Sequence, residues 1–183
     1  MTFVDIFKDL KRKVDLKLFP VESARKLGCK VGENTILEGI NLGSEPYLVE
    51  IGNNCHITYN VSFITHDGAT WVIKRKYDFK GTNYGKIIIR DNVFIGNHSL
   101  ILPNVEIGSN CVIGAGSVVT KSIPSDSVFA GNPAKFICSI EEYLQKCLIN
   151  KGNLQNSKYW DEYQEYEKNG KISKQQILTN FFK

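Results

Sequence analysis

The chain has 183 residues, of which 42% are hydrophobic and 23% charged, a composition typical of one globular domain with short appendages. It shows no run of about 18 apolar residues and no basic-apolar-small leader, so we expect neither a membrane span nor a secretory signal. A cytoplasmic location is then the default expectation. The net charge of +4 is too small to indicate nucleic-acid binding.

Residues 2–18 have the spacing of an amphipathic helix. Phe3, Ile6, Leu10 and Val14 recur at helical intervals among several lysines. We expect this helix to cover one end of the following domain, within a helical cap over residues 1–27. Contact of this basic helix with an anionic membrane is an open alternative.

From Val31 to Thr120 an aliphatic residue returns with a period of six. Isolated strands and helices have periods of two and 3.6, whereas a hexapeptide period is typical of a parallel β-helix, an all-β solenoid with one aliphatic column inside. The aliphatic positions are Val31, Leu37, Ile51, Ile57, Ile89, Ile95, Ile101, Ile107, Ile113 and Val119.

Two other positions of the repeat support this interpretation. The fifth position holds small or β-branched residues that should point inward: Thr35, Cys55, Val61, Val93, Ser99, Val105, Cys111, Ser117 and Ile123. The fourth holds residues that tolerate a left-handed backbone at a corner: Asn34, Asn54, Asn60, Asn92, Asn104, Asn110 and Gly116. Three hexapeptides form an 18-residue triangular coil, so Ile89 should stack on Ile107 and Ile95 on Ile113.

The period breaks after Phe63. The next aliphatic position, Ile89, is 26 residues away, about eight more than one coil needs. We expect a loop at about residues 69–86 to leave the coils, and such a loop is where specificity often resides. Its basic and aromatic residues, Trp71 among them, suit an anionic or sugar ligand, although a solvated loop with a structural tryptophan is equally compatible.

The C-terminal part, residues 138–183, is expected to be helical. Ser139–Glu142 and Ser173–Gln176 both have the form of a capping box, which predicts two helices. The odd number of cysteines without a C-x-x-C pair indicates reduced core thiols. They are Cys29, Cys55, Cys111, Cys138 and Cys147.

Several motifs along the repeat resemble the hexapeptide-repeat acyltransferases. They are Thr-His-Asp-Gly at 65–68, Ile-Gly-Asn-His at 95–98, Val-Ile-Gly-Ala-Gly-Ser-Val-Val-Thr-Lys at 112–121 and Ala-Gly-Asn-Pro-Ala-Lys at 130–135. The chain is most similar to the O-acetyltransferases of capsule, exopolysaccharide and lipopolysaccharide, and of maltose and galactosides. The resemblance implies a left-handed β-helix over residues 28–137, acetyl-CoA as donor, and a homotrimer with active sites between subunits.

Acetyl transfer to a hydroxyl needs a base, and histidine is the natural choice at neutral pH. His66 takes a corner position where the repeat breaks and matches the family's catalytic histidine, so it is the predicted general base. His56 should be an outward surface residue. His98 is a structural corner or acts from a neighbouring subunit. Asp67, at an inward fifth position, either binds the acceptor or is a buried polar group satisfied by corner amides.

The resemblance also implies the donor-binding residues. The small side chains of 114–117 leave strand backbone open for the pantetheine arm, and lysines would meet the phosphates. The matching contacts are Asn97, Ala115, Thr120, Lys121 and Lys135. Galactoside-type enzymes have a further basic residue where this chain has Cys138, which leaves one phosphate contact in doubt.

We therefore predict an acetyl-CoA-dependent O-acetyltransferase that modifies a carbohydrate hydroxyl, in surface-polysaccharide biosynthesis. Asp67 and Trp71 are the predicted acceptor-binding residues, and no metal or nucleic acid is expected. The alternatives are a simple sugar, serine or antibiotic as acceptor, or a non-catalytic β-helical scaffold. A zinc hydratase of the gamma carbonic anhydrase type is disfavoured because the three histidines lie 10 and 32 residues apart, without a close pair.

Overall fold

The computed structural model describes residues 18–154, with side chains through residue 149. The chain divides into two compact units, 1–141 and 142–183, and the first contains all the described strands. In chain order the elements are α2 (Pro20–Lys26), β1 (Lys30–Val31), β2 (Ile36–Leu37), the 3-10 helix η1 (Pro46–Leu48), β3 (Val49–Ile51), β4 (His56–Ile57), β5 (Ser62–Phe63), β6 (His66–Asp67), α3 (Thr70–Tyr77), β7 (Asn83–Tyr84), β8 (Ile87–Ile89), β9 (Val93–Ile95), β10 (Leu100–Ile101), β11 (Glu106–Ile107), β12 (Cys111–Ile113), β13 (Val118–Val119), β14 (Ser127–Ala130), β15 (Lys135–Ser139) and α4 (Ile140–Leu154).

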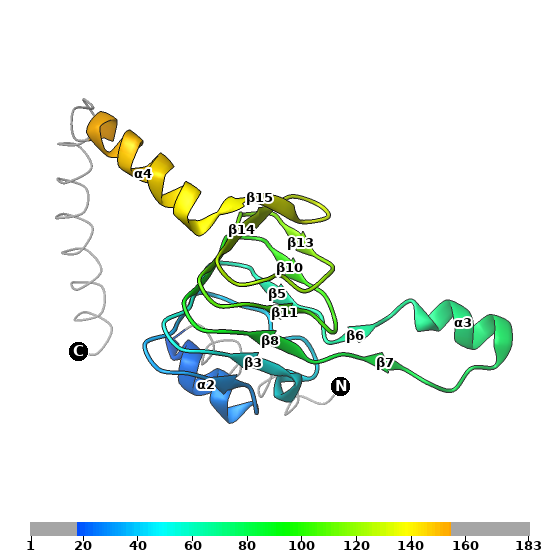
Figure 1. The fold of residues 1–183 in the computed structure, drawn as a ribbon. Coiled ribbons are helices and arrows are strands. Elements are labelled where there is room, and N and C mark those ends of the chain that lie inside the picture. Colours follow the sequence, from blue (N-terminus) through cyan, green and yellow to red (C-terminus); the bar gives the residue numbers. More distant parts are fainter. Residues whose placement is uncertain (1–17, 155–183) are drawn as a thin grey trace, which may run out of the picture. The chain divides into compact units, whose positions relative to one another are not determined.

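The short strands stack into three sheets of mainly parallel strands (Figure 1). Sheet A has the order β1-β3-β8-β11, sheet B the order β2-β4-β9-β12-β14-β15, and sheet C the order β5-β10-β13. From β8 to β13, consecutive strands pass from sheet A to sheet B to sheet C and back to sheet A, so the chain winds in three-sided coils. The closing strand β15 is the exception, because it pairs antiparallel to β14.

The strand register confirms the predicted stacking. Ile89 pairs with Ile107 and Ile95 with Ile113, one 18-residue coil apart. The aliphatic column is buried from Leu37 to Val119, while Val31 at its start is only partly buried. The predicted inward residues of the fifth position are buried throughout. Burial of these apolar side chains therefore stabilises the coils along one continuous column inside the solenoid.

The predicted corners are also confirmed. Every asparagine predicted at a corner has a φ between 54° and 64°, and Gly116 has a φ of 69°. His98 takes the same left-handed conformation, with a φ of 61°. Asparagine tolerates this region better than most residues, which explains its recurrence at the bends.

The excursion between β5 and β8 is an ordered arm. β6 and β7 pair antiparallel, His66 opposite Tyr84, and α3 lies between them. Figure 1 shows this arm projecting away from the coils. The sequence analysis predicted the excursion but described it only as a loop; its helix was not predicted, because eight residues with four polar and four apolar side chains give a weak periodic signal.

The ends of the chain are only partly described. Residues 2–17 of the predicted N-terminal helix, and the second C-terminal helix predicted from the capping box at 173–176, lie outside the described residues. The helix α4 begins at Ile140, directly after Ser139, in agreement with the predicted capping box. Within residues 18–154, no helix has the length and apolar character needed to cross a bilayer.

All five cysteines are free thiols. Four are buried, as predicted for core thiols, but Cys147 on α4 is exposed, so the prediction is wrong for that residue. Burial is the main cause that raises the pKa of the Cys29 thiol to about 12, which keeps it protonated and unreactive.

Candidate active site

The site is built where two irregular segments of the repeat meet. His66 follows β5 at the end of sheet C, in the first strand of the arm. Glu45 directly precedes η1, in the segment between Leu37 and Ile51, which are 14 residues apart instead of a multiple of six. Nδ1 of His66 lies 3.0 Å from Oε2 of Glu45.

The carboxylate of Glu45 is held by two partners. The Thr65 hydroxyl, on a side chain that is 1% exposed, donates to the same Oε2 that faces His66. This hydrogen bond first, and His66 second, lower the pKa of the Glu45 carboxyl below its ordinary value although burial opposes them. The carboxylate is therefore ionised at neutral pH, where it can only accept hydrogen bonds.

An ionised Glu45 determines the tautomer of His66. Since the carboxylate has no proton to give, Nδ1 of His66 donates this hydrogen bond, and in the neutral imidazole Nε2 then keeps its lone pair. The imidazole is 38% exposed, whereas the Glu45 side chain is 13% exposed. On the other side the Tyr84 ring lies 6.0 Å from the imidazole, centroid to centroid. The arrangement is an imidazole held by a carboxylate and partly accessible from solvent.

Two details of the prediction for this segment are wrong. His66 is in strand β6 and not at a left-handed corner, because the chain leaves the coil before the bend is made. Asp67 takes an inward position of the repeat but is exposed, so of its two predicted roles the buried polar group is wrong and acceptor binding stays a prediction. Its Oδ1 accepts a hydrogen bond from the Ala69 amide at 2.8 Å, which turns the chain into α3.

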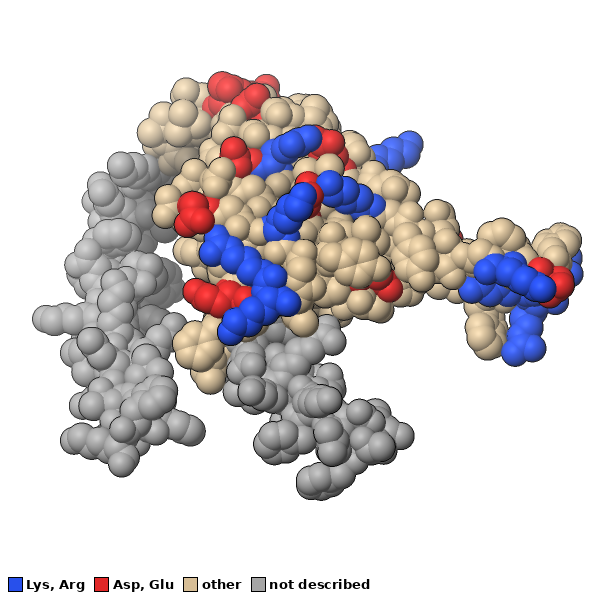
Figure 2. Space-filling view, turned by 90° about the horizontal axis from the view of Figure 1, so that it is seen from below, with Lys and Arg blue, Asp and Glu red and all other residues tan. Residues whose placement is uncertain are grey.

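The arm carries the predicted acceptor-binding residue Trp71 away from His66. Trp71 is 64% exposed in the first turn of α3, with the Arg75 guanidinium 4.9 Å from the centre of its ring. Lysine and arginine side chains gather at the outer end of the arm (Figure 2). The structure describes no contact between Trp71 and His66.

Two predicted donor-binding residues share the edge of sheet C with His66. Thr120 and Lys121 directly follow β13, and Lys121 takes the position that Thr65 takes after β5, with β10 between these strands. Because β5 and β13 are two strand spacings apart, their backbones lie about 10 Å from each other. Both Thr120 and Lys121 are exposed. Lys135 is exposed at the start of β15, next to Ala134, whose amide donates to the Val118 carbonyl at 2.9 Å.

The other two predicted donor-binding residues lie at the opposite edge of sheet C. Asn97 and Ala115 are at the corners that precede β10 and β13, and the Gly116 amide donates to the Asn97 carbonyl at 2.8 Å. His98 lies at the same corner as Asn97. Sheet C therefore separates the predicted donor residues of one chain into two groups.

The remaining histidine, His56, lies on the outer face of sheet B, half-exposed as predicted. Its Nε2 is 3.4 Å from Oε2 of Glu38. Among the residues that the structure describes, no group of three or more His, Cys, Asp or Glu side chains could hold a metal ion.

Glu45 and Thr65 are the site residues that the sequence analysis missed. Thr65 was noted only as part of a motif, and Glu45 was not singled out. The sequence signal that could have indicated Glu45 was the irregular 14-residue interval between Leu37 and Ile51. Residues in such an irregular segment do not have to stack in the coil, so they are available for a functional site.

Comparison with known proteins agrees with this architecture. The family model described as bacterial transferase hexapeptide (six repeats) matches residues 86–121. Protein CapG of Staphylococcus aureus is 47% identical over 132 residues, covering 70% of this chain and 76% of CapG. The galactoside O-acetyltransferase of Escherichia coli (strain K12) is 42% identical over 99 residues, covering 54% of this chain and only 47% of that enzyme.

A solved structure supports the fold. The hexapeptide-repeat containing acetyltransferase VCA0836 of Vibrio cholerae O1 biovar eltor, complexed with acetyl coenzyme A, matches with a TM-score of 0.55 and 22% sequence identity. The match covers 70% of this chain and 83% of that one. With the repeat, the stacked parallel coils and the extensive identity to CapG, these findings show that the chain belongs to the hexapeptide-repeat family of acyltransferase enzymes.

Proposed function

We propose that this protein is an acetyl-CoA-dependent O-acetyltransferase that modifies a carbohydrate hydroxyl, with His66 as general base. The observation that carries the proposal is the Glu45 carboxylate 3.0 Å from Nδ1 of His66. This contact fixes the tautomer with a basic Nε2 and stabilises the positive charge that His66 acquires when it takes a proton. Glu45 acts through His66 and is a positioning residue.

The chemical step follows from these roles. Nε2 of His66 removes the proton from the acceptor hydroxyl as its oxygen attacks the acetyl carbonyl carbon. The bond from that carbon to sulfur breaks, and the thiolate leaves and takes the proton from Nε2. The products are the acetyl ester and free thiol, and His66 returns to its starting form; its Nδ1 keeps its proton throughout and donates it in a hydrogen bond to Glu45.

The predicted donor residues have the chemistry that acetyl-CoA requires. Ala115 is exposed, and space is open around the α-carbon of Gly116, where an added Cβ would meet nothing within 4 Å. A pantetheine arm can therefore approach the backbone at this corner. The exposed ammonium groups of Lys121 and Lys135 would bind the phosphates.

We infer that the active enzyme is a homotrimer of left-handed coils, as the family resemblance implies. The separation of the donor residues by sheet C supports this assembly. The His66 and Lys121 edge of one subunit would face the Asn97 and Ala115 edge of the next, and the donor would lie between them. In this proposal residues 28–137 form the catalytic coils, and residues 1–27 and 138–183 precede and follow them in the sequence.

The acceptor is proposed from the relatives and from the arm. One relative is named galactoside O-acetyltransferase, and an exposed tryptophan is a common stacking surface for a sugar ring. In a trimer the arm could place Trp71 over the site of a neighbouring subunit, with Asp67 at the base of the arm offering a carboxylate oxygen to a sugar hydroxyl. A surface-polysaccharide unit is the acceptor class that we favour.

The test is thiol release from acetyl-CoA with a panel of mono-, oligo- and nucleotide-linked sugars, plus serine and chloramphenicol. We expect sugar-dependent turnover that is lost in His66→Ala while the melting temperature and CoA affinity are unchanged. Turnover with serine or chloramphenicol alone would replace the carbohydrate by a small acceptor. Undiminished activity of His66→Ala would overturn the assignment of the base, and failure to bind CoA would favour a scaffold.

A further inference from the structure

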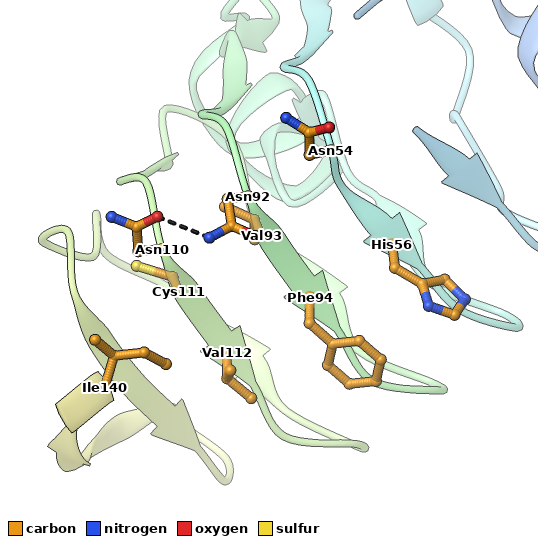
Figure 3. Close-up of a pocket in the computed structure, with 9 residues that line it drawn as sticks. All are labelled: Asn54, His56, Asn92, Val93, Phe94, Asn110, Cys111, Val112 and Ile140. Atoms are coloured by element: carbon orange, nitrogen blue, oxygen red, sulfur yellow. Dashed lines mark hydrogen bonds between the residues drawn. The ribbon is translucent and has the colours of Figure 1, made fainter. Parts of the chain in front are cut away.

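The outer face of sheet B holds a hollow that the proposed reaction does not use. Its volume is about 210 Å³, and it lies over β4, β9 and β12, whereas His66 lies beyond sheet C. Figure 3 shows two rows of side chains across these strands. The amide row is Asn54, Asn92 and Asn110, and the other row is His56, Phe94 and Val112.

The amide row is interrupted at the hollow. Nδ2 of Asn34 donates to Asn54 at 3.4 Å, that of Asn92 to Asn110 at 2.8 Å, and that of Asn110 to Asp126 at 2.7 Å. The corresponding bond between Asn54 and Asn92 is absent from the part of the chain described here, although their strands are paired. A donor on Asn54 and an acceptor on Asn92 therefore remain available to a ligand.

An aromatic surface lies beside these free amide groups. Phe94 is 39% exposed and points outward, and the His56 ring packs edge-on against it with centroids 5.6 Å apart. Nε2 of His56 is shielded from water and makes no hydrogen bond within residues 18–149, although Oε2 of Glu38 is 3.4 Å away. The hollow thus combines an exposed apolar ring with spare amide groups.

This combination selects a ligand class. No lysine or arginine lines the hollow, which argues against a phosphate or another anion. Amide groups next to an aromatic ring suit a neutral sugar, whose hydroxyls exchange hydrogen bonds while its apolar face covers the ring. The rows repeat at the strand spacing of about 4.8 Å, comparable with one sugar residue along a chain.

We propose that the outer face of sheet B is a docking subsite for a neutral oligosaccharide chain, separate from the His66 site. The proposal rests on the proposed function in one respect, since the docked glycan is taken to be part of a polymeric acceptor. Phe94 provides the stacking surface, and Asn54 and Asn92 bind hydroxyl groups of the same sugar residue.

The test is isothermal titration of the full chain with maltohexaose, cellohexaose and mannohexaose. At least one should bind, and Phe94→Ala should weaken binding about tenfold, while Phe94→Tyr retains it. Ile88→Ala is the matched control, since Ile88 faces outward in the same position of a coil on sheet A. Absence of binding, equal effects of Phe94→Ala and Ile88→Ala, or a preference for a heparin hexasaccharide would each overturn the subsite.

These measurements separate the two proposals. Binding that depends on Phe94 and persists in His66→Ala supports the subsite whether or not acetyl transfer occurs, so absent transfer would then count against the proposed function alone. Acetyl transfer to an oligosaccharide with binding indifferent to Phe94→Ala would support the function and reject the subsite.

Discussion

Replacing Glu45 by glutamine tests the proposed base directly. Glu45→Gln keeps an oxygen that can accept from Thr65 and from Nδ1 of His66, but it removes the negative charge. A hydrogen bond to a charged group contributes about 1.5–3 kcal/mol and a neutral one about 0.5–1.5 kcal/mol, a difference of roughly 1–1.5 kcal/mol. His66 is 38% exposed, so solvent screening favours the lower value. We expect kcat to fall roughly five- to tenfold.

Glu45→Ala should be more damaging. It removes the partner of Nδ1 and also the acceptor of the buried Thr65 hydroxyl, so His66 loses its orientation as well as the nearby charge. We expect a loss approaching the roughly 100-fold or greater contribution of a general base. Glu50→Gln is the matched control, because Glu50 is a partly buried carboxylate with a lowered pKa that faces Lys30 and Lys86 on sheet A.

The assay is steady-state thiol release at saturating acetyl-CoA, with melting temperatures to exclude unfolding. Equal kcat values for wild type, Glu45→Gln and Glu45→Ala would refute the positioning role. A loss in Glu50→Gln as large as in Glu45→Gln would show that the effect is not specific to His66.

The same substitution has a consequence for stability. The pKa of Glu45 is lowered in the folded protein, so its contribution is present above the pKa of the unfolded chain and is lost as pH falls through the folded value. The difference in unfolding free energy between wild type and Glu45→Gln should therefore be constant near neutral pH and shrink in acid. Urea unfolding at a series of pH values measures it, and a difference that grows in acid would contradict the assignment.

Three further predictions concern the coils and the thiols. Ile95→Ala should lower the free energy of unfolding by about 2–5 kcal/mol because Ile95 is 0% exposed, whereas Ile36→Ala, at a 53% exposed position, should cost below about 1 kcal/mol in urea unfolding. Asn104→Ala should cost about 1–2 kcal/mol because its φ is 64°, while Asn104→Gly should match wild type; equal losses would reject the backbone explanation. A thiol reagent should label Cys147 quickly and Cys29 only on unfolding, and equal labelling rates in the folded protein would contradict this.

Much of the coil architecture could be predicted because each coil repeats the same physical requirement. A buried aliphatic such as Ile95 must stack on its counterpart Ile113 one coil later, and a corner such as Asn104 must tolerate a positive φ. These constraints are local and periodic, so the spacing of the residues in the sequence is enough to predict them. The spacing does not depend on whether the coils are left-handed or right-handed, so the left-handed twist is predicted from the family resemblance alone.

The site was less predictable because it depends on where the period fails. His66 could be selected from its motif, but its corner position was wrong, since β6 leaves the coil instead of turning. Glu45 lies 21 residues earlier in an irregular segment, and nothing in the spacing shows that the two would meet. The helix α3 was missed for a related reason, since its exposed residues show no apolar face with a clear period.

The two irregular segments explain why the candidate active site lies where it does. In a regular coil the inward positions are fixed by stacking, and the corner positions by a left-handed backbone, so neither can easily hold a charged pair. The segment before η1 and the start of the arm are free of both constraints. They meet at the end of sheet C, where the buried Thr65 hydroxyl holds Glu45 and the His66 imidazole is 38% exposed, as the proposed contact with an acceptor requires. The regular coils form the edge of sheet C, and the two departures from them carry the residues of the candidate site.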